Sequence, residues 1–320
     1  MINSSSVRAA LVEEALAHYE LDVSDCAEVR VTNNAVFRLH TPGGDYALRI
    51  HRPGYRPPQQ IRSELTFVAA LAERSEVVVP HPVRARSGDV VAFIEAGGEV
   101  RYASVVTWLD GAVRRPGHGA GRATLFRIGQ ALGRIHRFSE TFDPPDSFEL
   151  PTWDIATLFD AERLRLIEST SHRQLVDQVV LRAGDLFAEL IRTPGTYGVL
   201  HHDFILLNCL HSRRQTAVID FDDCGWGFYL QDLGGLLGNL KDYRSYRELR
   251  GWFVDGYESV RPFPSADEQD LELMIALRHC TTVLWLLERR AVGAMPVDLF
   301  ERNVTYRIEE IESSIAKLTG

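Results

Sequence analysis

The chain has 320 residues, of which 45% are hydrophobic and 25% are charged, as in an ordinary globular protein with one large core or two lobes. Its 35 Lys and Arg residues against 44 Asp and Glu residues give a net charge of −9, and without a basic block this argues against nucleic-acid binding. The four cysteines form no Cys-x-x-Cys pair, no secretory signal is visible, and the longest apolar run is too short to cross a bilayer. We therefore expect a cytoplasmic protein with no membrane partner.

The first fifty residues predict a helix followed by antiparallel strands. Ser6 has the character of an N-cap for a helix from Val7 to about Tyr19. Strands are expected over residues 27–31, 35–40 and 46–51, because short apolar runs there alternate with turn residues.

The turn between the first two of these strands contains Asn33 and Asn34. Asn tolerates a positive φ, and a backbone N–H in such a turn can face an anion. The turn has no glycine, so two interpretations stay open: a contact to a nucleotide phosphate, or an ordinary hairpin turn.

Arg49 and Glu64 are expected to form an ion pair. Arg49 shares the polar face of its strand with His51. Glu64 lies beside the apolar stripe of a helix predicted from Gln60 to Glu73. A carboxylate near a buried face needs a cationic partner, and Arg49 is the candidate. The pair is either a nucleotide contact or purely structural.

Further strands are predicted over residues 83–86, 90–95 and 101–107, and the strand run ends at Trp108-Leu109-Asp110. We place the domain boundary near Asp110. This divides the chain into an N-terminal domain of residues 1–110 and a C-terminal domain of residues 111–320.

The C-terminal domain is predicted to be mainly helical. His136 closes a helix over residues 124–138 and is interpreted as structural. Asp232 either caps the helix that follows it or braces the preceding polar loop. Helices are also expected over residues 153–188, 243–257 and 267–290.

A polar motif inside this domain places amide and carboxylate groups among apolar residues. If the runs 208–210 and 218–220 pair antiparallel about Arg214, Asn208 falls opposite Asp220, roughly 5 Å apart at Cα. Carboxylate and amide oxygens at that separation suit one hard cation. The sequence therefore predicts a magnesium site at Asn208 and Asp220.

Two further carboxylates accompany this site. Asp203, five residues before Asn208, is expected to lie beside the ion as a free carboxylate, and Asp222 is a candidate ligand of a second ion. A single Asp after a buried strand is more often a turn or helix cap than a ligand. Three polar residues at this spacing favour a site.

The pattern His201-x-Asp203, four residues, Asn208, then an apolar strand ending in Asp220-Phe-Asp222 resembles the catalytic core of the aminoglycoside phosphotransferase and choline kinase superfamily. The Leu-Arg-Ile-His-Arg-Pro strand and the Asp-Phe-Asp-Asp-x-Gly-Trp-Gly run look most like the branch of bacterial stress-response kinases and type II homoserine kinases. The resemblance implies an α+β, two-lobed protein-kinase-like fold, with a small β-rich N-lobe and a larger helical C-lobe.

The resemblance also implies roles for individual residues. Asp203 would be the catalytic base, and Asn208 and Asp220 would hold Mg²⁺ bridging the nucleotide phosphates. Arg49 and Glu64 would take the place of the lysine–glutamate pair of kinases, with a guanidinium in place of an ammonium. Backbone groups near Thr107 and Leu109 would meet the purine base.

We therefore expect an enzyme that moves the γ-phosphoryl group of ATP or GTP to a hydroxyl of a small molecule. Only about ten residues separate the Asp-Phe-Asp-Asp run from the next helix, too few for the peptide-binding segment of a protein kinase. Three alternatives stay open: a kinase acting on protein Ser or Thr, a catalytically silent nucleotide-binding regulator, and a metal-dependent hydrolase using His201 and His202 with the carboxylates. The sequence does not identify the acceptor.

Overall fold

The computed structural model describes residues 5–31, 34–96, 98–213, 215–264 and 268–319. The chain divides into two compact units, each assembled from three separate stretches of sequence. The first unit comprises Met1–Ala112, Asp143–Leu150 and Leu210–Asp222, and the second comprises Val113–Phe142, Pro151–Cys209 and Asp223–Gly320.

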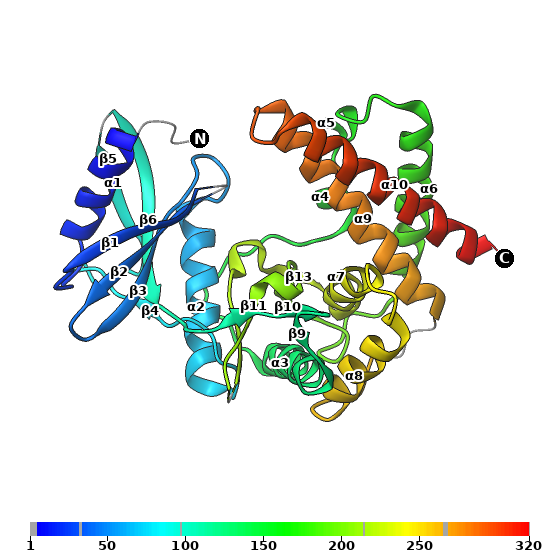
Figure 1. The fold of residues 1–320 in the computed structure, drawn as a ribbon, viewed down its shortest axis with the longest axis horizontal. Helices are drawn as coiled ribbons and strands as arrows, with labels where there is room; N and C mark the ends of the chain where they lie inside the picture. Colours follow the sequence, from blue (N-terminus) through cyan, green and yellow to red (C-terminus); the bar gives the residue numbers. More distant parts are fainter. Residues whose placement is uncertain (1–4, 32–33, 97, 214, 265–267, 320) are drawn as a thin grey trace. The chain divides into compact units, whose positions relative to one another are not determined.

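The first unit begins with a helix and an antiparallel sheet, drawn from blue to cyan in Figure 1. In the sheet the strand order is β1-β2-β3-β6-β4, and β5 also pairs with β6. The predicted strands are confirmed, except that the strand expected over residues 83–86 is reduced to Pro82–Val83. Ser6 lies inside the first helix, so its prediction as an N-cap is wrong. The elements are α1 (Ser5–Ala17), β1 (Asp25–Val31), β2 (Ala35–Thr41), β3 (Gly44–Ile50), α2 (Pro58–Arg74), β4 (Pro82–Val83), β5 (Ala92–Ala96) and β6 (Glu99–Thr107).

One face of this sheet forms the core of the first unit. Leu48 and Ile50 of β3 are fully buried and pack in one cluster with Leu11 of α1. Because side chains alternate along a strand, Arg49 points to the opposite face. Alternation in β3 therefore fixes the direction of the arginine that the sequence singles out.

Helix α2 supplies the carboxylate partner of that arginine. Its first residue is Pro58, a favoured residue at a helix start, and its apolar stripe includes the buried Ile61 and Leu65. Glu64 lies on the buried side of the helix and is only 4% exposed. The predicted position of Glu64 beside the apolar stripe is confirmed.

The hairpin that follows the polar motif has a different register from the predicted one. Its strands are β11 (Cys209–His211) and β12 (Thr216–Val218), neighbours in a small sheet with β7 (Ala112–Val113). The N–H of Ser212 donates to the carbonyl of Gln215 at 3.0 Å and closes the turn, while Arg214 lies outside the described residues. Asn208 ends a 3₁₀ turn (Leu206–Asn208), and Asp220 follows β12 with a φ of 68°. The prediction that Asn208 and Asp220 are cross-strand neighbours is wrong, because both residues lie outside the paired strands.

The second unit is mainly helical, and the helices predicted in it are confirmed. A further helix at the C-terminal end, α10, was not predicted. The elements of the second unit are β8 (Arg115–Pro116), β9 (Gly119–Ala120), α3 (Arg122–Thr141), α4 (Ile155–Leu158), α5 (Ala161–Arg165), α6 (Thr170–Glu189), β10 (Tyr197–Leu200), β13 (Gly225–Phe228), α7 (Tyr229–Lys241), α8 (Tyr246–Glu258), α9 (Glu268–Ala291) and α10 (Val297–Thr319).

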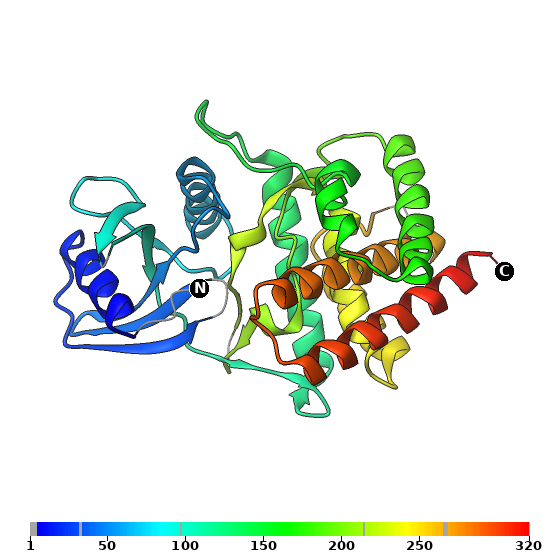
Figure 2. The ribbon, with the colours of Figure 1, turned by 90° about the horizontal axis from the view of Figure 1, so that it is seen from above.

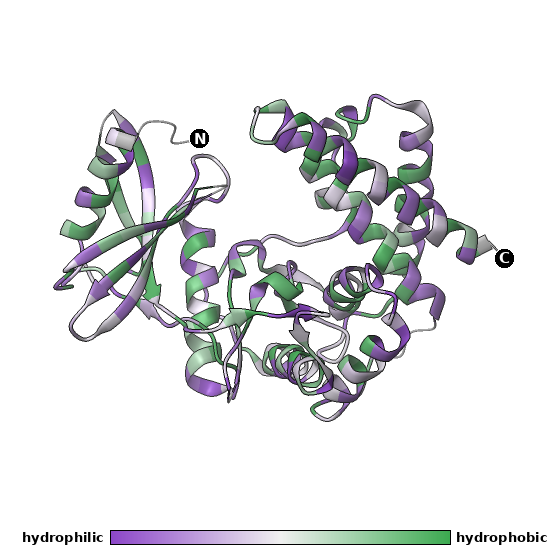
Figure 3. Ribbon diagram, in the orientation of Figure 1, coloured by the Kyte–Doolittle hydropathy of each residue, from purple (hydrophilic) through white to green (hydrophobic). Residues whose placement is uncertain are grey.

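Close helix packing holds the second unit together. Gly129 of α3 and Gly256 of α8 face each other's helices so closely that a Cβ on either glycine would lie 2.0 Å from a backbone oxygen. Helices α9 and α10 lie side by side in both views (Figures 1 and 2). The long helices carry hydrophobic and hydrophilic residues along their lengths (Figure 3), as expected when one side is buried. Within the described residues, no helix has the length and apolar character needed to cross a membrane.

Candidate active site

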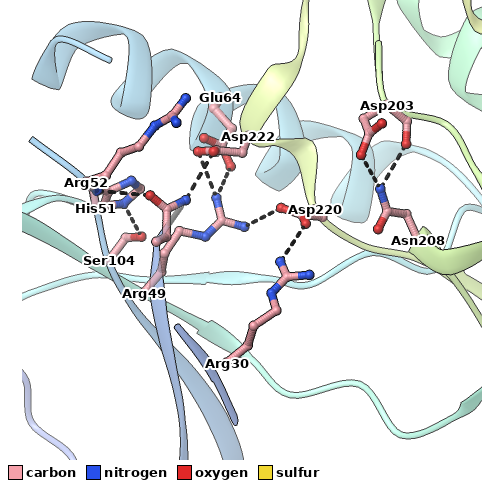
Figure 4. Close-up of polar contacts among 11 residues, drawn as sticks. Arg30, Arg49, His51, Arg52, Glu64, Ser104, Asp203, Asn208, Asp220 and Asp222 are labelled. Carbon is pink, nitrogen blue, oxygen red and sulfur yellow. Dashed lines mark hydrogen bonds and ion pairs between the residues drawn. The ribbon is translucent and has the colours of Figure 1, made fainter. Parts of the chain in front are cut away.

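The first unit places three carboxylates around one guanidinium, as Figure 4 shows for Arg49. Nη1 of Arg49 donates to Oε1 of Glu64 at 2.9 Å, so the predicted ion pair is confirmed. The same guanidinium lies 3.4 Å from Asp220 Oδ1 and 3.5 Å from Asp222 Oδ1. Arg30 pairs with the other oxygen of Asp220 at 3.1 Å. We call these five residues the Arg49 cluster.

The electrostatics of the Arg49 cluster follow from its burial. Burial acts to lower the pKa of Arg49, but Glu64, Asp222 and Asp220 together raise it above its ordinary value. Burial raises the pKa of Glu64 to about 7, although Arg49 acts in the opposite direction. The cluster therefore brings three carboxylates together, and two arginines balance their negative charge.

Backbone geometry brings Asp220 into this cluster. Its φ of 68° lies in the left-handed region, which Asp occupies more readily than most residues but which still costs conformational energy. The residue therefore leaves the strand direction of β12 and turns its carboxylate toward Arg49. Strain of this kind is common at functional sites.

Asn34 is tied to the same cluster by its side chain. Its Nδ2 donates to Asp222 Oδ2 at 3.1 Å, and its Oδ1 accepts from the N–H of Arg52 at 3.0 Å. The Asn34 side chain therefore braces Asp222. Of the two interpretations of this turn, neither the phosphate contact nor the ordinary hairpin turn is tested, and the phosphate contact stays a prediction. Asn33 lies outside the described residues.

Thr107 and Leu109 were predicted to meet the purine base. Thr107 ends β6, and its N–H donates to the carbonyl of His81 at 2.9 Å, so that N–H is already used within the sheet. Leu109 follows two residues later, outside any strand. Their contact with a base stays a prediction.

In the second unit, Asp232 braces the loop that carries Asp203. Its Oδ2 accepts from the N–H of His201 at 2.9 Å and its Oδ1 from the N–H of His202 at 2.7 Å. His202 has a φ of 63°, and its ring stacks on Trp153 with centroids 4.1 Å apart. Of the two predicted roles of Asp232, bracing the loop is confirmed.

A chain of buried hydrogen bonds stabilises Asp232 in turn. His136 Nε2 lies 3.2 Å from Asp232 Oδ2, and its Nδ1 lies 2.8 Å from the hydroxyl of Tyr257, which accepts from Arg261 at 2.6 Å. Burial lowers the pKa of His136, so we assign a neutral ring that donates to Asp232. Burial acts to raise the pKa of Asp232, but hydrogen bonding by His136 and the His201 N–H holds it below its ordinary value. The structural role predicted for His136 is confirmed.

Asp203 itself is held by two side chains. Nδ2 of Asn208 donates to both the carbonyl and Oδ2 of Asp203 at 2.9 Å (Figure 4). Arg278 of α9 contacts Oδ1 of Asp203 and donates to the carbonyl of His202 at 3.1 Å. Both carboxylate oxygens of Asp203 are therefore engaged by other side chains. Its predicted place beside an ion that it does not ligate stays a prediction. Sequence spacing gives no sign of the Arg278 contact, since 75 residues separate the two side chains.

Each unit by itself offers oxygen donors. In the second unit, Asn208 directs its amide nitrogen toward Asp203, which leaves its Oδ1 for a ligand. In the first unit, Asp220 and Asp222 supply carboxylates. Oxygen ligands of this kind suit Mg²⁺. In the described part of the chain, no group of three or more His, Cys, Asp or Glu side chains is arranged to hold a metal ion. The set of histidines and carboxylates that the hydrolase alternative requires is therefore not found as such a group among these residues.

Comparison with known proteins gives the chain its relatives. Residues 28–263 match the phosphotransferase enzyme family. The homoserine kinase of Methylobacterium radiotolerans is 27% identical over 294 residues, which cover 85% of this chain and 85% of that protein.

Two solved structures share the fold. A microcompartment-associated aminopropanol kinase superposes with a TM-score of 0.82 and 25% identity, covering 96% of this chain and 97% of that one. An amicoumacin kinase solved with AMP-PNP, Ca²⁺ and its antibiotic superposes with a TM-score of 0.79 and 20% identity, covering 94% and 92%. The predicted α+β protein-kinase-like fold and the family resemblance are confirmed.

Proposed function

Because the chain belongs to the phosphotransferase enzyme family and is an enzyme that transfers phosphoryl groups to alcohols, we propose that it uses the γ-phosphoryl of ATP or GTP with Mg²⁺ and a small-molecule acceptor. Nucleotide binding belongs to residues 1–110 and acceptor binding to residues 111–320. The cytoplasmic location stays a prediction from the cysteine pattern.

The observation that carries this proposal is the position of Asp203. Its carboxylate is held by Asn208, on a loop whose N–H groups are fixed by Asp232. In the proposed reaction Asp203 orients the acceptor hydroxyl and receives its proton. The hydroxyl oxygen bonds to the γ-phosphorus as the bond to the leaving nucleoside diphosphate breaks.

The residues around the phosphates supply positioning and charge. Asn208, Asp220 and Asp222 would hold Mg²⁺, which when bound neutralises the phosphate oxygens. Arg49, kept in place by Glu64, would exchange its contacts with Asp220 and Asp222 for the nucleotide phosphates. Asn33, Asn34, Thr107 and Leu109 are the remaining proposed nucleotide contacts. Positioning and electrostatic stabilisation provide most of the acceleration in such reactions.

A small acceptor is favoured over a protein. Only residues 224–228 lie between the turn that holds Asp222 (Phe221–Asp223) and the start of α7, and Gly225–Phe228 of this stretch form β13. The segment is thus a strand within the second unit, which leaves no extended loop for a peptide substrate. The hydrolase alternative is disfavoured because the His202 ring stacks on Trp153.

The test combines activity and nucleotide binding. Wild-type protein is incubated with ATP or GTP, Mg²⁺ and a panel of hydroxyl compounds, and nucleoside diphosphate release is measured. We expect Asp203→Ala to lower turnover about 10³-fold while nucleotide binding survives, and Asp220→Ala to weaken binding of the magnesium nucleotide. The exposed Asp185 on α6 offers a matched control, Asp185→Ala, with unchanged turnover. Full activity in Asp203→Ala would contradict the assignment.

A further inference from the structure

Along one side of helix α9, a stripe of side chains changes from buried to exposed near the loop that carries Asp203. Met274, Arg278, Trp285 and Arg289 follow one another at spacings of four, seven and four, which places them on one side of the helix. Met274 is 1% exposed and packs tightly on α7. A Cβ added at Gly234 of α7 would lie only 2.6 Å from the Cβ of Met274. Trp285 is 40% exposed. Arg278 therefore stands where this side of α9 changes from buried to open.

The guanidinium of Arg278 contacts the loop that carries Asp203. One nitrogen donates to the His202 carbonyl at 3.1 Å and the other contacts Asp203 Oδ1. The side chains of Arg278 and Asp203 are 25% and 26% exposed, so solvent reaches the pair. A guanidinium at this position is close enough to touch an acceptor whose hydroxyl meets Asp203.

The open part of the stripe is cationic and aromatic. The guanidinium of Arg289 lies 5.7 Å from the centre of the Trp285 ring. The neighbouring carboxylate of Glu288 is paired with Arg163 of α5 at 2.6 Å. Apart from the neighbouring Asp203, the charged groups along the stripe are therefore the positive guanidinium groups of Arg278 and Arg289. They favour an anionic ligand and disfavour an ammonium group.

We propose that Arg278 selects the acceptor by binding an anionic group on it, so that the acceptor is a short hydroxy acid. This inference rests on the proposed function. In the structure Arg278 pairs with Asp203. The carboxylate of the acceptor takes over this guanidinium and frees Asp203 Oδ1 for the acceptor hydroxyl.

The geometry also limits the length of the acceptor. Arg278 contacts Asp203 directly, so the carboxylate and the hydroxyl must be separated by only a few bonds. A planar guanidinium can bind a carboxylate through two hydrogen bonds, which a lysine cannot reproduce. Arg278 is thus a specificity-determining residue of the acceptor side.

The experiment uses three four-carbon probes matched in length: 4-hydroxybutanoate, 1,4-butanediol and 4-amino-1-butanol. Binding to the full chain is measured by calorimetry and turnover by ADP release with ATP and Mg²⁺. We expect wild-type protein to prefer the anionic probe over the neutral one by at least about tenfold, and to discriminate further against the cationic one. Arg278→Met should reduce the preference to near unity, and Arg278→Lys should retain part of it.

A matched control lies on the same helix. Arg290 is exposed, points away from the stripe and stacks on Phe300 at 4.7 Å, so Arg290→Met removes the same charge without touching the loop. It should leave the preference unchanged, and urea unfolding checks that each variant is folded. Equal binding of the three probes by wild-type protein, or a preference that survives in Arg278→Met, overturns the inference. Preferential binding that Arg278→Met abolishes, with no ADP release from any probe, supports the inference and counts against the proposed function alone.

Discussion

The two units hold their site carboxylates by different physical means. In the Arg49 cluster, Glu64, Asp220 and Asp222 face a shared guanidinium, so charge is balanced by charge. In the second unit, the buried Asp232 is satisfied by two backbone N–H groups and the ring of His136. In the first arrangement the carboxylates need cations close to them, and in the second the carboxylate fixes the backbone of a loop. Mutations in the two arrangements should therefore change stability and activity in different ways.

The largest expected effect is the removal of the shared guanidinium. Arg49→Met leaves Glu64, whose side chain is 6% exposed, without its cation, and should lower the free energy of unfolding by about 4 kcal/mol. Urea unfolding at pH 7.5 measures this. Adding Glu64→Gln should recover much of the loss, because the buried charge is then gone.

Arg30 provides the matched control for this prediction. Its side chain is 56% exposed and also pairs with Asp220, so Arg30→Met should change the free energy of unfolding by less than about 1 kcal/mol. Equal losses in the two arginine variants would show that burial does not distinguish them.

A smaller effect is expected where dipoles rather than charges provide the partners. Asp232→Ala leaves the N–H groups of His201 and His202 without their acceptor and should lower the free energy of unfolding by about 3 kcal/mol. Turnover should also fall, because the backbone that carries Asp203 is no longer fixed, whereas nucleotide affinity should stay near that of wild type. Asp185→Ala is again the control, and unchanged turnover in Asp232→Ala would contradict the bracing role.

Acid should affect the second unit through His279. Burial, reinforced by Arg307, lowers the pKa of this histidine to about 3, and Arg307 donates to its Nδ1 at 2.9 Å. The unfolded chain binds the proton near the ordinary histidine pKa, so the contribution of His279 to stability is present above that pKa and is lost as the pH falls toward 3. Between pH 8 and pH 5 this loss should reach about 2 kcal/mol.

The measurement is the pH dependence of urea unfolding for wild type and His279→Gln. Glutamine keeps an acceptor for Arg307 but does not titrate, so the variant should lose less stability than wild type over this range. His136, whose pKa burial also lowers, should leave a residual slope of the same sign in both proteins. Parallel curves would mean that His279 titrates normally in the folded chain.

Local signals in the sequence predicted much of this arrangement. Alternation in β3 and the helical stripe of α2 were enough to pair Arg49 with Glu64, because both patterns are properties of a single element. Helix α10 was missed, although Phe300, Val304, Ile308, Ile311 and Ile315 recur at helical spacing. Part of this stripe is buried against other helices, as Ile311 shows with no exposed surface, so a closer count of periodicity would have found it.

Other features depend on contacts that no local pattern encodes. The register between Asn208 and Asp220 was wrong because one residue lies in a 3₁₀ turn and the other takes a left-handed φ. The side-chain bond from Asn34 to Asp222 joins residues 188 positions apart.

By itself, the sequence determined the family, the kinase-like fold and which polar side chains matter, because these rest on residue types at short, fixed spacings. Only the tertiary structure decided what those side chains touch. Arg278 reaches Asp203, and Arg49 reaches Asp220 and Asp222, through the packing of elements far apart in the chain. Burial then sets their electrostatics, since the energy of an ion pair depends on the solvent around it more than on the identity of its members.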